Sequence, residues 1–239
     1  MTRMDTDTTS SGSSPRRGIA RAFSTALAAV LLVCAILGVS FSLLLTPYPT
    51  KLATQLFSVE EGTGLTHDEC AQVGQGVLAF CMGDDDARLP WGATETPTTL
   101  GEQSRTHLLS VRAFFFGMIE FAAVSSCCLA AALVFVRRRF GRRAVGNALL
   151  AGGIGAVSLA AVFTAIALVD FYDLFNWLHG WFFSSGTWLF PGDALLIRSL
   201  PEPLWMFLGA LLVILIAAFS VGCIVGGRRL RKTPTTFSK

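Results

Sequence analysis

Charged residues are scarce in this chain. Asp, Glu, Lys and Arg make up 15% of its 239 residues, whereas soluble domains carry about a quarter. The mean hydropathy is +0.58, and 52% of the residues are hydrophobic. Much of the chain therefore lies where charge is costly, which excludes an ordinary soluble domain. The net charge is only +3, and we expect no nucleic-acid partner.

The motifs of several enzyme classes are also absent. The chain has no Gly-x-Ser-x-Gly nucleophile elbow, no Walker motif and no His-Glu-x-x-His metal motif. None of its three histidines is followed five positions later by Asp, a spacing common among soluble-loop acyltransferases. We expect no cofactor and no metal site.

Long apolar runs dominate what is present. Four stretches of 24 or 25 residues (22–45, 113–136, 145–169 and 203–227) contain a single charged residue, Glu120. About 20 apolar residues suffice for a helix to cross the hydrocarbon core of a bilayer. The alternating segments of a β-barrel are missing. The fold class is therefore all-α: a polytopic membrane protein with a four-helix transmembrane bundle.

The basic residues indicate the orientation of the bundle. Of the 19 Lys and Arg residues, 14 lie in the two tails and in the connection between the second and third spans. Such residues collect on the cytoplasmic side. We therefore expect a multi-pass protein of the cell membrane with both termini in the cytoplasm. Its parts are a disordered tail (1–19), a transmembrane domain (20–227) and a basic tail (228–239), with extracytoplasmic loops at 46–106 and 170–202.

The second extracytoplasmic segment is unusually aromatic. Nine of the 22 residues from Phe171 to Gly192 are aromatic, so this segment is expected to lie along the membrane interface. An aromatic belt explains the rings. It does not explain Asp173, Asn176 and His179 in the same stretch.

Two cysteines, Cys70 and Cys81, lie in the first extracytoplasmic loop. A pair of cysteines in an oxidising compartment is a disulfide candidate. The alternative is a pair of free, half-buried thiols, and the sequence does not decide between them.

The histidines divide into one residue in the loop and two at the interface. His67 stands beside acidic residues and is expected to be solvated. His107 precedes the second span and His179 follows the third, so both lie at the depth of the outer interface. Two imidazoles at one depth can meet across the bundle, with Arg112 facing the same outer cavity. They can also ligate haem or a metal, although metal sites usually need more ligands. Glu120 is expected to face the bundle interior.

At these residues the chain resembles the lipoprotein intramolecular transacylase (Lit) family of four-span bacterial membrane proteins. The specific blocks are 174–190, which reads LFNWLHGWFFSSGTWLF, and 193–205, which reads DALLIRSLPEPLW. A shorter block, THLLSVR at 106–112, is also similar, but Ser110 stands where the family has an acid. The resemblance covers everything after the N-terminal tail.

The resemblance implies an acyl shift within a lipoprotein. The substrate is a diacylglyceryl-cysteine, and its sn-2 acyl chain moves to the cysteine's own α-amino group, giving a lyso-form lipoprotein. His179 is assigned as general base, and His107 as its partner, an acid or an oxyanion stabiliser. Asn176 is expected to orient the base, and Arg112 and Arg198 are candidates for contact with the oxyanion or headgroup. The aromatic segment would seat the acyl chains.

A second class of function stays open at this point, namely a non-enzymatic membrane protein that binds lipid or a protein partner. The transacylase interpretation names diacylglyceryl lipoproteins and membrane lipid as partners. The sequence does not fix the oligomeric state, and a monomer is favoured.

Overall fold

The computed structural model describes residues 15–184 and 186–232, which form eight helices and no strand. The helices are α1 (Pro15–Leu44), α2 (Pro47–Phe57), α3 (His67–Cys81), α4 (Glu102–Phe140), α5 (Arg142–Val169), α6 (Phe171–Phe182), α7 (Leu195–Ser199) and α8 (Glu202–Lys232). Four of them, α1, α4, α5 and α8, are long and apolar enough to cross a membrane. The predicted all-α, four-span membrane protein is confirmed.

The helices extend beyond the predicted spans. α1 begins at Pro15 and α8 continues to Lys232, so residues 15–19 and 228–232 are helical where the sequence predicts tails. The remaining tail residues, 1–14 and 233–239, lie outside the described ranges. α4 begins at Glu102, eleven residues before its predicted span. Hydropathy marks only the apolar part of each helix, whereas the hydrogen-bonded helix continues into the polar flanks.

Small residues bring the spanning helices close together. A Cβ atom added to Gly227 of α8 would lie 2.7 Å from the carbonyl oxygen of Gly146 in α5. Glycine at these positions lets the two backbones touch, a common mode of packing in membranes. Gly222 and Gly226 form a G-x-x-x-G pattern nearby, but a Cβ on either would meet nothing within 4 Å. The contact between α5 and α8 is therefore made by Gly227, which is not part of the G-x-x-x-G pattern.

The outer surface of the bundle is apolar. Val30, Val124 and Ile214 are about 60% exposed, each on a different spanning helix. In lipid this surface needs no further cover. Glu120 is also exposed on α4, so the expectation that it faces the bundle interior is wrong.

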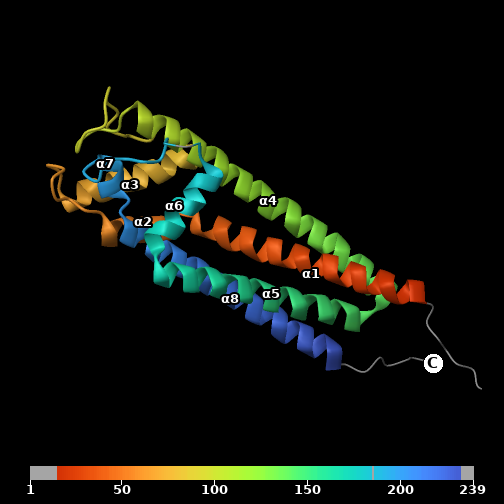
Figure 1. Cartoon of the computed structure of the whole chain (residues 1–239). Coiled ribbons are helices and arrows are strands. Elements are labelled where there is room, and N and C mark those ends of the chain that lie inside the picture. The colour runs from red at the N-terminus through yellow and green to blue at the C-terminus, as the bar shows by residue number, and fades with distance from the viewer. Residues whose placement is uncertain (1–14, 185, 233–239) are drawn as a thin grey trace, which may run out of the picture.

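The chain places its loops at one end of the bundle and both described ends at the other (Figure 1). The start of α1, the end of α8 and the connection between α4 and α5 lie at the same end of the bundle, away from α2, α3, α6 and α7. We call the opposite end, made of residues 45–101 and 170–201, the head region. This arrangement agrees with an even number of crossings.

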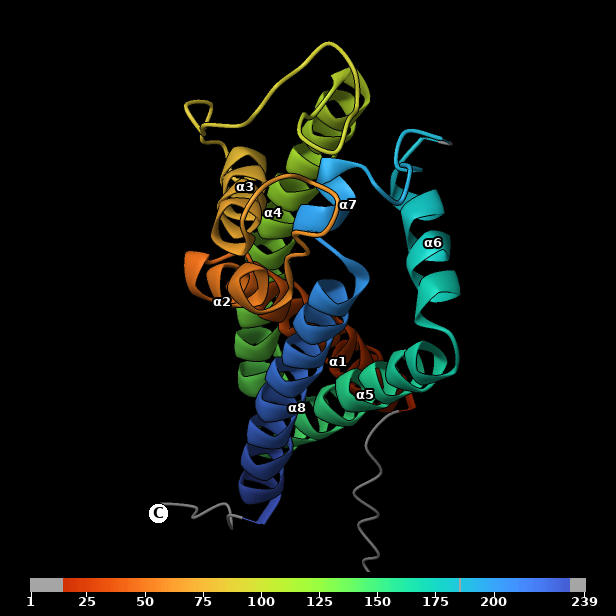
Figure 2. The ribbon, with the colours of Figure 1, turned by 90° about the vertical axis from the view of Figure 1, so that its left-hand side faces the viewer.

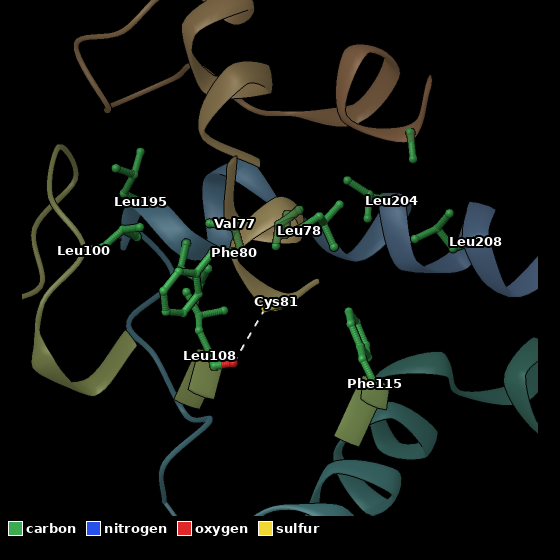
Figure 3. Close-up of a cluster of buried hydrophobic side chains, with 13 residues drawn as sticks. Val77, Leu78, Phe80, Cys81, Leu100, Leu108, Phe115, Leu195, Leu204 and Leu208 are labelled. Atoms are coloured by element: carbon green, nitrogen blue, oxygen red, sulfur yellow. Dashed lines mark hydrogen bonds between the residues drawn. The ribbon is translucent and has the colours of Figure 1, made fainter. Parts of the chain in front are cut away.

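An apolar cluster holds the head region on the bundle (Figure 3). Its buried side chains come from α2, α3, α4, α7 and α8, and from the loop residues Leu100 and Leu200. Leu100, Leu195 and Leu204 are fully buried within it. Backbone bonds add to this packing: Val59 N–H donates to the carbonyl of Arg198 at 2.8 Å. The two loop segments, far apart in sequence, therefore form one unit.

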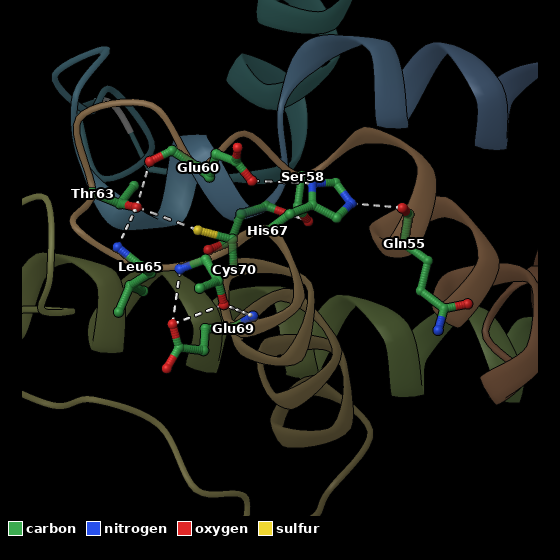
Figure 4. A network of polar contacts seen from close by, with 10 residues as sticks. Gln55, Ser58, Glu60, Thr63, Leu65, His67, Glu69 and Cys70 are labelled. Carbon is green, nitrogen blue, oxygen red and sulfur yellow. Dashed lines mark hydrogen bonds and ion pairs between the residues drawn. The ribbon is translucent and has the colours of Figure 1, made fainter.

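The start of α3 is fixed by a capping box (Figure 4). The Thr66 side chain accepts a bond from Glu69 N–H, and the Glu69 carboxylate accepts one from Thr66 N–H at 2.8 Å. Next to the cap, the His67 ring contacts the carbonyl oxygen of Gln55 at 2.8 Å. His67 thus ties α3 to α2.

The aromatic segment begins as a separate helix. Asp170 has an extended backbone, which interrupts helical bonding after α5. Its carboxylate then accepts a bond from Asp173 N–H at 2.9 Å and caps α6. α6 consequently leaves α5 and runs up along one side of the head region, as part of it (Figure 2).

Candidate active site

The preceding loop caps the start of α4. The N-cap residue, Gly101, has no side chain to offer, and the carboxylate of Glu95 takes its place. It accepts bonds from Ser104 N–H at 2.7 Å and from the Ser104 hydroxyl at 2.8 Å. A carboxylate at a helix N-terminus also complements the helix dipole. His107 follows one turn later, with its side chain 7% exposed.

Aromatic contacts fix α6 between two spanning helices. Phe175 packs against Trp205 of α8 with ring centroids 5.9 Å apart. At the other end, Phe182 packs against Phe114 of α4 at 4.7 Å. His179 lies between these two contacts in the sequence, on a helix supported at both ends.

The structure brings His107 and His179 together. Their ring centroids are 6.2 Å apart. Phe183 contacts both rings, at 5.1 Å from His107 and 5.3 Å from His179. The two residues are 72 positions apart in sequence and come from different helices. The pair therefore lies in an apolar, aromatic surrounding.

A backbone bond fixes the proton position on His179. Its Nδ1 lies 2.9 Å from the carbonyl oxygen of Phe175. Because a carbonyl only accepts, Nδ1 carries the hydrogen of the neutral ring and Nε2 keeps a lone pair. Burial lowers the pKa of His179 below 6.5, while the bond to Phe175 acts in the opposite direction. The ring is therefore a neutral base with Nε2 available near pH 7.

His107 is enclosed more tightly than His179. Phe183 and Phe190 pack on its ring, the latter at 5.7 Å. Its Nδ1 is buried and has no hydrogen-bond partner among the described residues. A buried polar atom without a partner is unfavourable. The unpaired Nδ1 of His107 therefore marks a place where a further hydrogen-bonding group is expected.

A loop after α6 covers the pair. The side-chain amide of Gln103 donates to the carbonyl of Leu189 at 2.9 Å and of Gly186 at 3.4 Å. Between these carbonyls, Trp188 packs on the His179 ring at 5.4 Å. The sequence prediction assigned no role to Gln103 or Trp188. The available signals were that Gln103 lies one helical turn before His107 and that Trp188 belongs to the block 174–190.

Neither Asn176, which was predicted to orient His179, nor Ser110, which stands in place of the family's acid, forms a hydrogen bond to a histidine among the described residues. The Phe175 carbonyl, not Asn176, makes the bond that orients His179. Asn176 is a half-buried neighbour on the same helix. The Ser110 hydroxyl donates to the carbonyl of Thr106 at 3.1 Å and so bonds to its own helix.

The two predicted arginines differ in their contacts. Arg112 forms an ion pair with Asp85 and lies over the Phe80 ring, 5.8 Å from its centroid. The bond from Arg112 lowers the pKa of Asp85. Arg198 is half-buried on α7, and its Nε is buried without a partner in residues 15–184 and 186–232. Arg112 thus ties the loop before residue 88 to α4, whereas Arg198 keeps an unused donor.

The cysteines are free thiols. Cys70 and Cys81 both lie on α3, eleven residues apart, which is about 16 Å along a helix. A disulfide needs Cα atoms within about 7 Å. The disulfide alternative is therefore wrong. The thiols are free, as the other alternative has it, but they are fully buried and not half-buried. Burial raises the pKa of the Cys81 thiol to about 12, so it stays protonated.

Comparison with known proteins places this geometry in a family. The family model described as lipoprotein intramolecular transacylase Lit matches residues 23–205. No curated protein matches the sequence.

Solved structures share the fold. The membrane-integral lipoprotein intramolecular transacylase Lit from Bacillus cereus superposes with a TM-score of 0.74 at 16% identity, covering 90% of this chain and 97% of that one. Two histidine variants of the same protein, one with arginine and one with alanine, each superpose with a TM-score of 0.71 at 15% identity. They cover 91% of this chain and 94% and 96% of theirs. With the family model matching most of its length, the chain belongs to the lipoprotein intramolecular transacylase family and is an enzyme of that class.

Proposed function

We propose that this enzyme moves the sn-2 acyl chain of a diacylglyceryl-cysteine lipoprotein to the lipoprotein's own N-terminal amino group. The observation that carries the proposal is the histidine pair. One imidazole has its Nε2 lone pair free, and a second lies 6.2 Å away in an aromatic enclosure. The family membership sets the reaction class, and the pair supplies the acid–base groups that the reaction needs.

The amine must lose a proton during the reaction. An α-amino group titrates near about 8 and is mostly protonated at neutral pH. The ammonium form first gives up one proton to solvent, because only the neutral amine has a lone pair. As the neutral nitrogen then attacks the ester carbonyl carbon, Nε2 of His179 takes the second proton that the nitrogen releases. A neutral imidazole with a lowered pKa is ready for this role at pH 7.

The two oxygens of the ester must also be stabilised as the reaction proceeds. Attack turns the carbonyl oxygen into an oxyanion, and the bond from carbon to the glycerol sn-2 oxygen then breaks. The departing oxygen takes up the proton held by His179, which returns the imidazole to its neutral form. His107 assists this transfer as an acid or a hydrogen-bond donor, from a ring whose Nδ1 has no other partner among the described residues.

Amine and ester belong to one substrate molecule, so no protein nucleophile is required. Holding the two groups at attack distance removes much of the entropic cost of the reaction. The rings of Phe183, Trp188 and Phe190 around the pair offer apolar contacts for the acyl chains and exclude water. A dry site also protects the ester from hydrolysis.

The head region, in this proposal, faces away from the cytoplasm at the cell membrane, where exported lipoproteins carry their modified cysteine. The basic residues gathered at the opposite end of the bundle support this orientation. That end contains both described ends of the chain and the turn at Gly141.

Mass spectrometry of a tryptic lipopeptide tests the proposal. Cells that express the wild-type chain and a reporter lipoprotein should yield N-acylated, lyso-form termini, and cells with His179→Ala should yield diacylglyceryl termini. His67→Ala is the matched control, because His67 contacts Gln55 in the head region and belongs to neither ring of the pair. Diacylglyceryl termini in all three strains would refute the proposal.

A further inference from the structure

The loop over the histidine pair holds an indole whose N–H has no acceptor among residues 15–184 and 186–232. Nε1 of Trp188 is buried, and it contacts no acceptor within the described part of the chain. An indole N–H donates and cannot accept. The atom is buried from water, so this donor is unsatisfied within the part of the chain that the structure describes. Buried polar groups are rarely unpaired in native proteins, and an exception calls for an explanation.

The neighbours of Trp188 place it at the reacting groups. Its ring lies 5.4 Å from that of His179, the proposed base. Phe190, two residues further on, packs on His107. An ester held between the two imidazoles therefore lies beside the indole. Arg198 also has a buried donor without a partner among the described residues, but no hydrogen bond or ring contact there joins it to either imidazole.

The loop that carries the indole is anchored to helix α4. Gln103 lies on α4, one turn before His107, and its amide binds the carbonyls of Gly186 and Leu189 on either side of Trp188. The same helix thus fixes the position of one histidine and of the loop that carries the indole. A donor that is fixed before the reaction costs no reorganisation when charge develops.

We propose that Trp188 is a catalytic residue whose indole N–H donates a hydrogen bond to the oxyanion formed during acyl transfer. The inference rests on the proposed function. When the amine nitrogen bonds to the carbonyl carbon, the carbonyl oxygen receives the electron pair of the broken π bond. The N–H of Trp188 donates to that oxygen without transferring its proton. The bond weakens again when the carbonyl re-forms and the glycerol oxygen leaves.

A donor of this kind acts on the transition state more than on the bound substrate. Loss of one oxyanion donor lowers kcat about 100-fold or more in enzymes where it has been tested. Because the ground-state carbonyl binds less strongly, KM should change little. This split separates the catalytic role from simple packing of an acyl chain, which would raise KM.

The test uses the purified full chain in liposomes with a synthetic diacylglyceryl-cysteinyl lipopeptide, and it follows the lyso product by mass spectrometry. Trp188→Phe keeps an aromatic ring and removes the N–H. We expect kcat to fall about 100-fold with KM unchanged. Trp91→Phe is the matched control, because Trp91 packs on Phe80 in the head region and contacts neither histidine. It should retain wild-type kcat.

A second replacement separates the N–H from the shape of the ring. Substituting 3-benzothienylalanine at position 188 puts sulfur in place of the N–H in a fused ring of nearly the same size. It should be as slow as Trp188→Phe. The inference about Trp188 is overturned if either variant keeps the kcat of the wild-type chain, or if only its KM rises. In both cases, turnover by the wild-type chain still upholds the proposed function. Lack of turnover by the wild-type chain, with diacylglyceryl termini in cells, overturns the proposed function itself.

Discussion

The spanning bundle and the head region are both helical, but different interactions hold them together. In the bundle, glycine and alanine let backbones touch, as at Gly146 and Gly227, and the outer surface stays apolar. In the head region, polar groups bond across loops, as Ser58 Oγ does to the carbonyl of Ser199 at 3.0 Å. The bundle is thus packed for lipid, whereas the head region is built with the bonds of a soluble domain.

The histidine pair lies where the two regions meet. Phe114 and Trp205 of the spanning helices support α6 from below, and Gln103 holds the covering loop from above. This position suits a substrate whose acyl chains lie in lipid and whose amine is attached to a protein outside it. Changes at the boundary should therefore affect chemistry, and changes in the bundle should affect stability.

The largest effect is expected at the pair itself. His179→Ala should lower kcat about 10²- to 10⁴-fold, the usual contribution of a general base, and His107→Ala should act in the same direction. Because the two rings serve one proton transfer in the proposed mechanism, the double variant should be little slower than the slower single variant. Steady-state rates with the lipopeptide measure this. Strictly multiplicative losses would show that the histidines act independently.

A contrasting loss of stability is expected in the bundle. Gly227→Ala places a methyl group 2.7 Å from the Gly146 carbonyl oxygen, so the helices must separate. Overpacking of this kind costs about 1–3 kcal/mol. Thermal unfolding in detergent should show a lower Tm, while kcat per folded molecule is retained. Gly222→Ala, where the added methyl group meets nothing within 4 Å, is the control and should leave the Tm unchanged.

The pH titration of His179 tests how far the covering loop buries this ring, at the boundary between the bundle and the head region. Its pKa is lowered by burial, so NMR titration of the imidazole should give a midpoint below 6.5, with the neutral ring protonated at Nδ1. The unfolded chain takes up this proton first as the pH falls through about 6.5, so His179 reduces stability below that pH and not above it. Gln103→Leu frees the covering loop and should move the midpoint up towards 6.5. An unchanged midpoint in this variant would show that the loop does not bury the ring.

The smallest effect is expected at the ion pair between Arg112 and Asp85, since the Asp85 side chain is 75% exposed. An exposed pair contributes little to stability because water screens it. Asp85→Asn should retain kcat and lower the Tm less than Gly227→Ala does. Arg112→Gln is the informative partner. If it lowers kcat while Asp85→Asn does not, Arg112 contacts the substrate as well as the loop.

Hydropathy and local signals were enough to predict the spans and the break before the aromatic segment. Apolar runs identify the four spanning helices because charge is costly in lipid. Asp170 directly follows the third run and caps the next helix. His107 and His179 could be paired because both flank a span on the same side, which fixes their depth.

Contacts that depend on helix rotation or on distant loops were not predictable from one sequence. Gly227 packs on α5 while Gly222 and Gly226 do not, and only the rotation of α8 decides between these registers. Glu120 lies on the outer face for the same reason. The bond from Gln103 to the Leu189 carbonyl joins positions 86 residues apart, and nothing local to either residue indicates it.

The length of α4 links the site to the membrane. The helix has 39 residues, about 58 Å, whereas the hydrocarbon core of a bilayer is about 30 Å thick. His107 is carried on the part that projects, about 9 Å beyond the start of the apolar run at Ala113. One continuous helix therefore sets the height of His107 above the lipid. Under the proposed mechanism, we expect the reaction rate to depend on bilayer thickness, because a thicker membrane raises the ester towards the histidines and a thinner one lowers it.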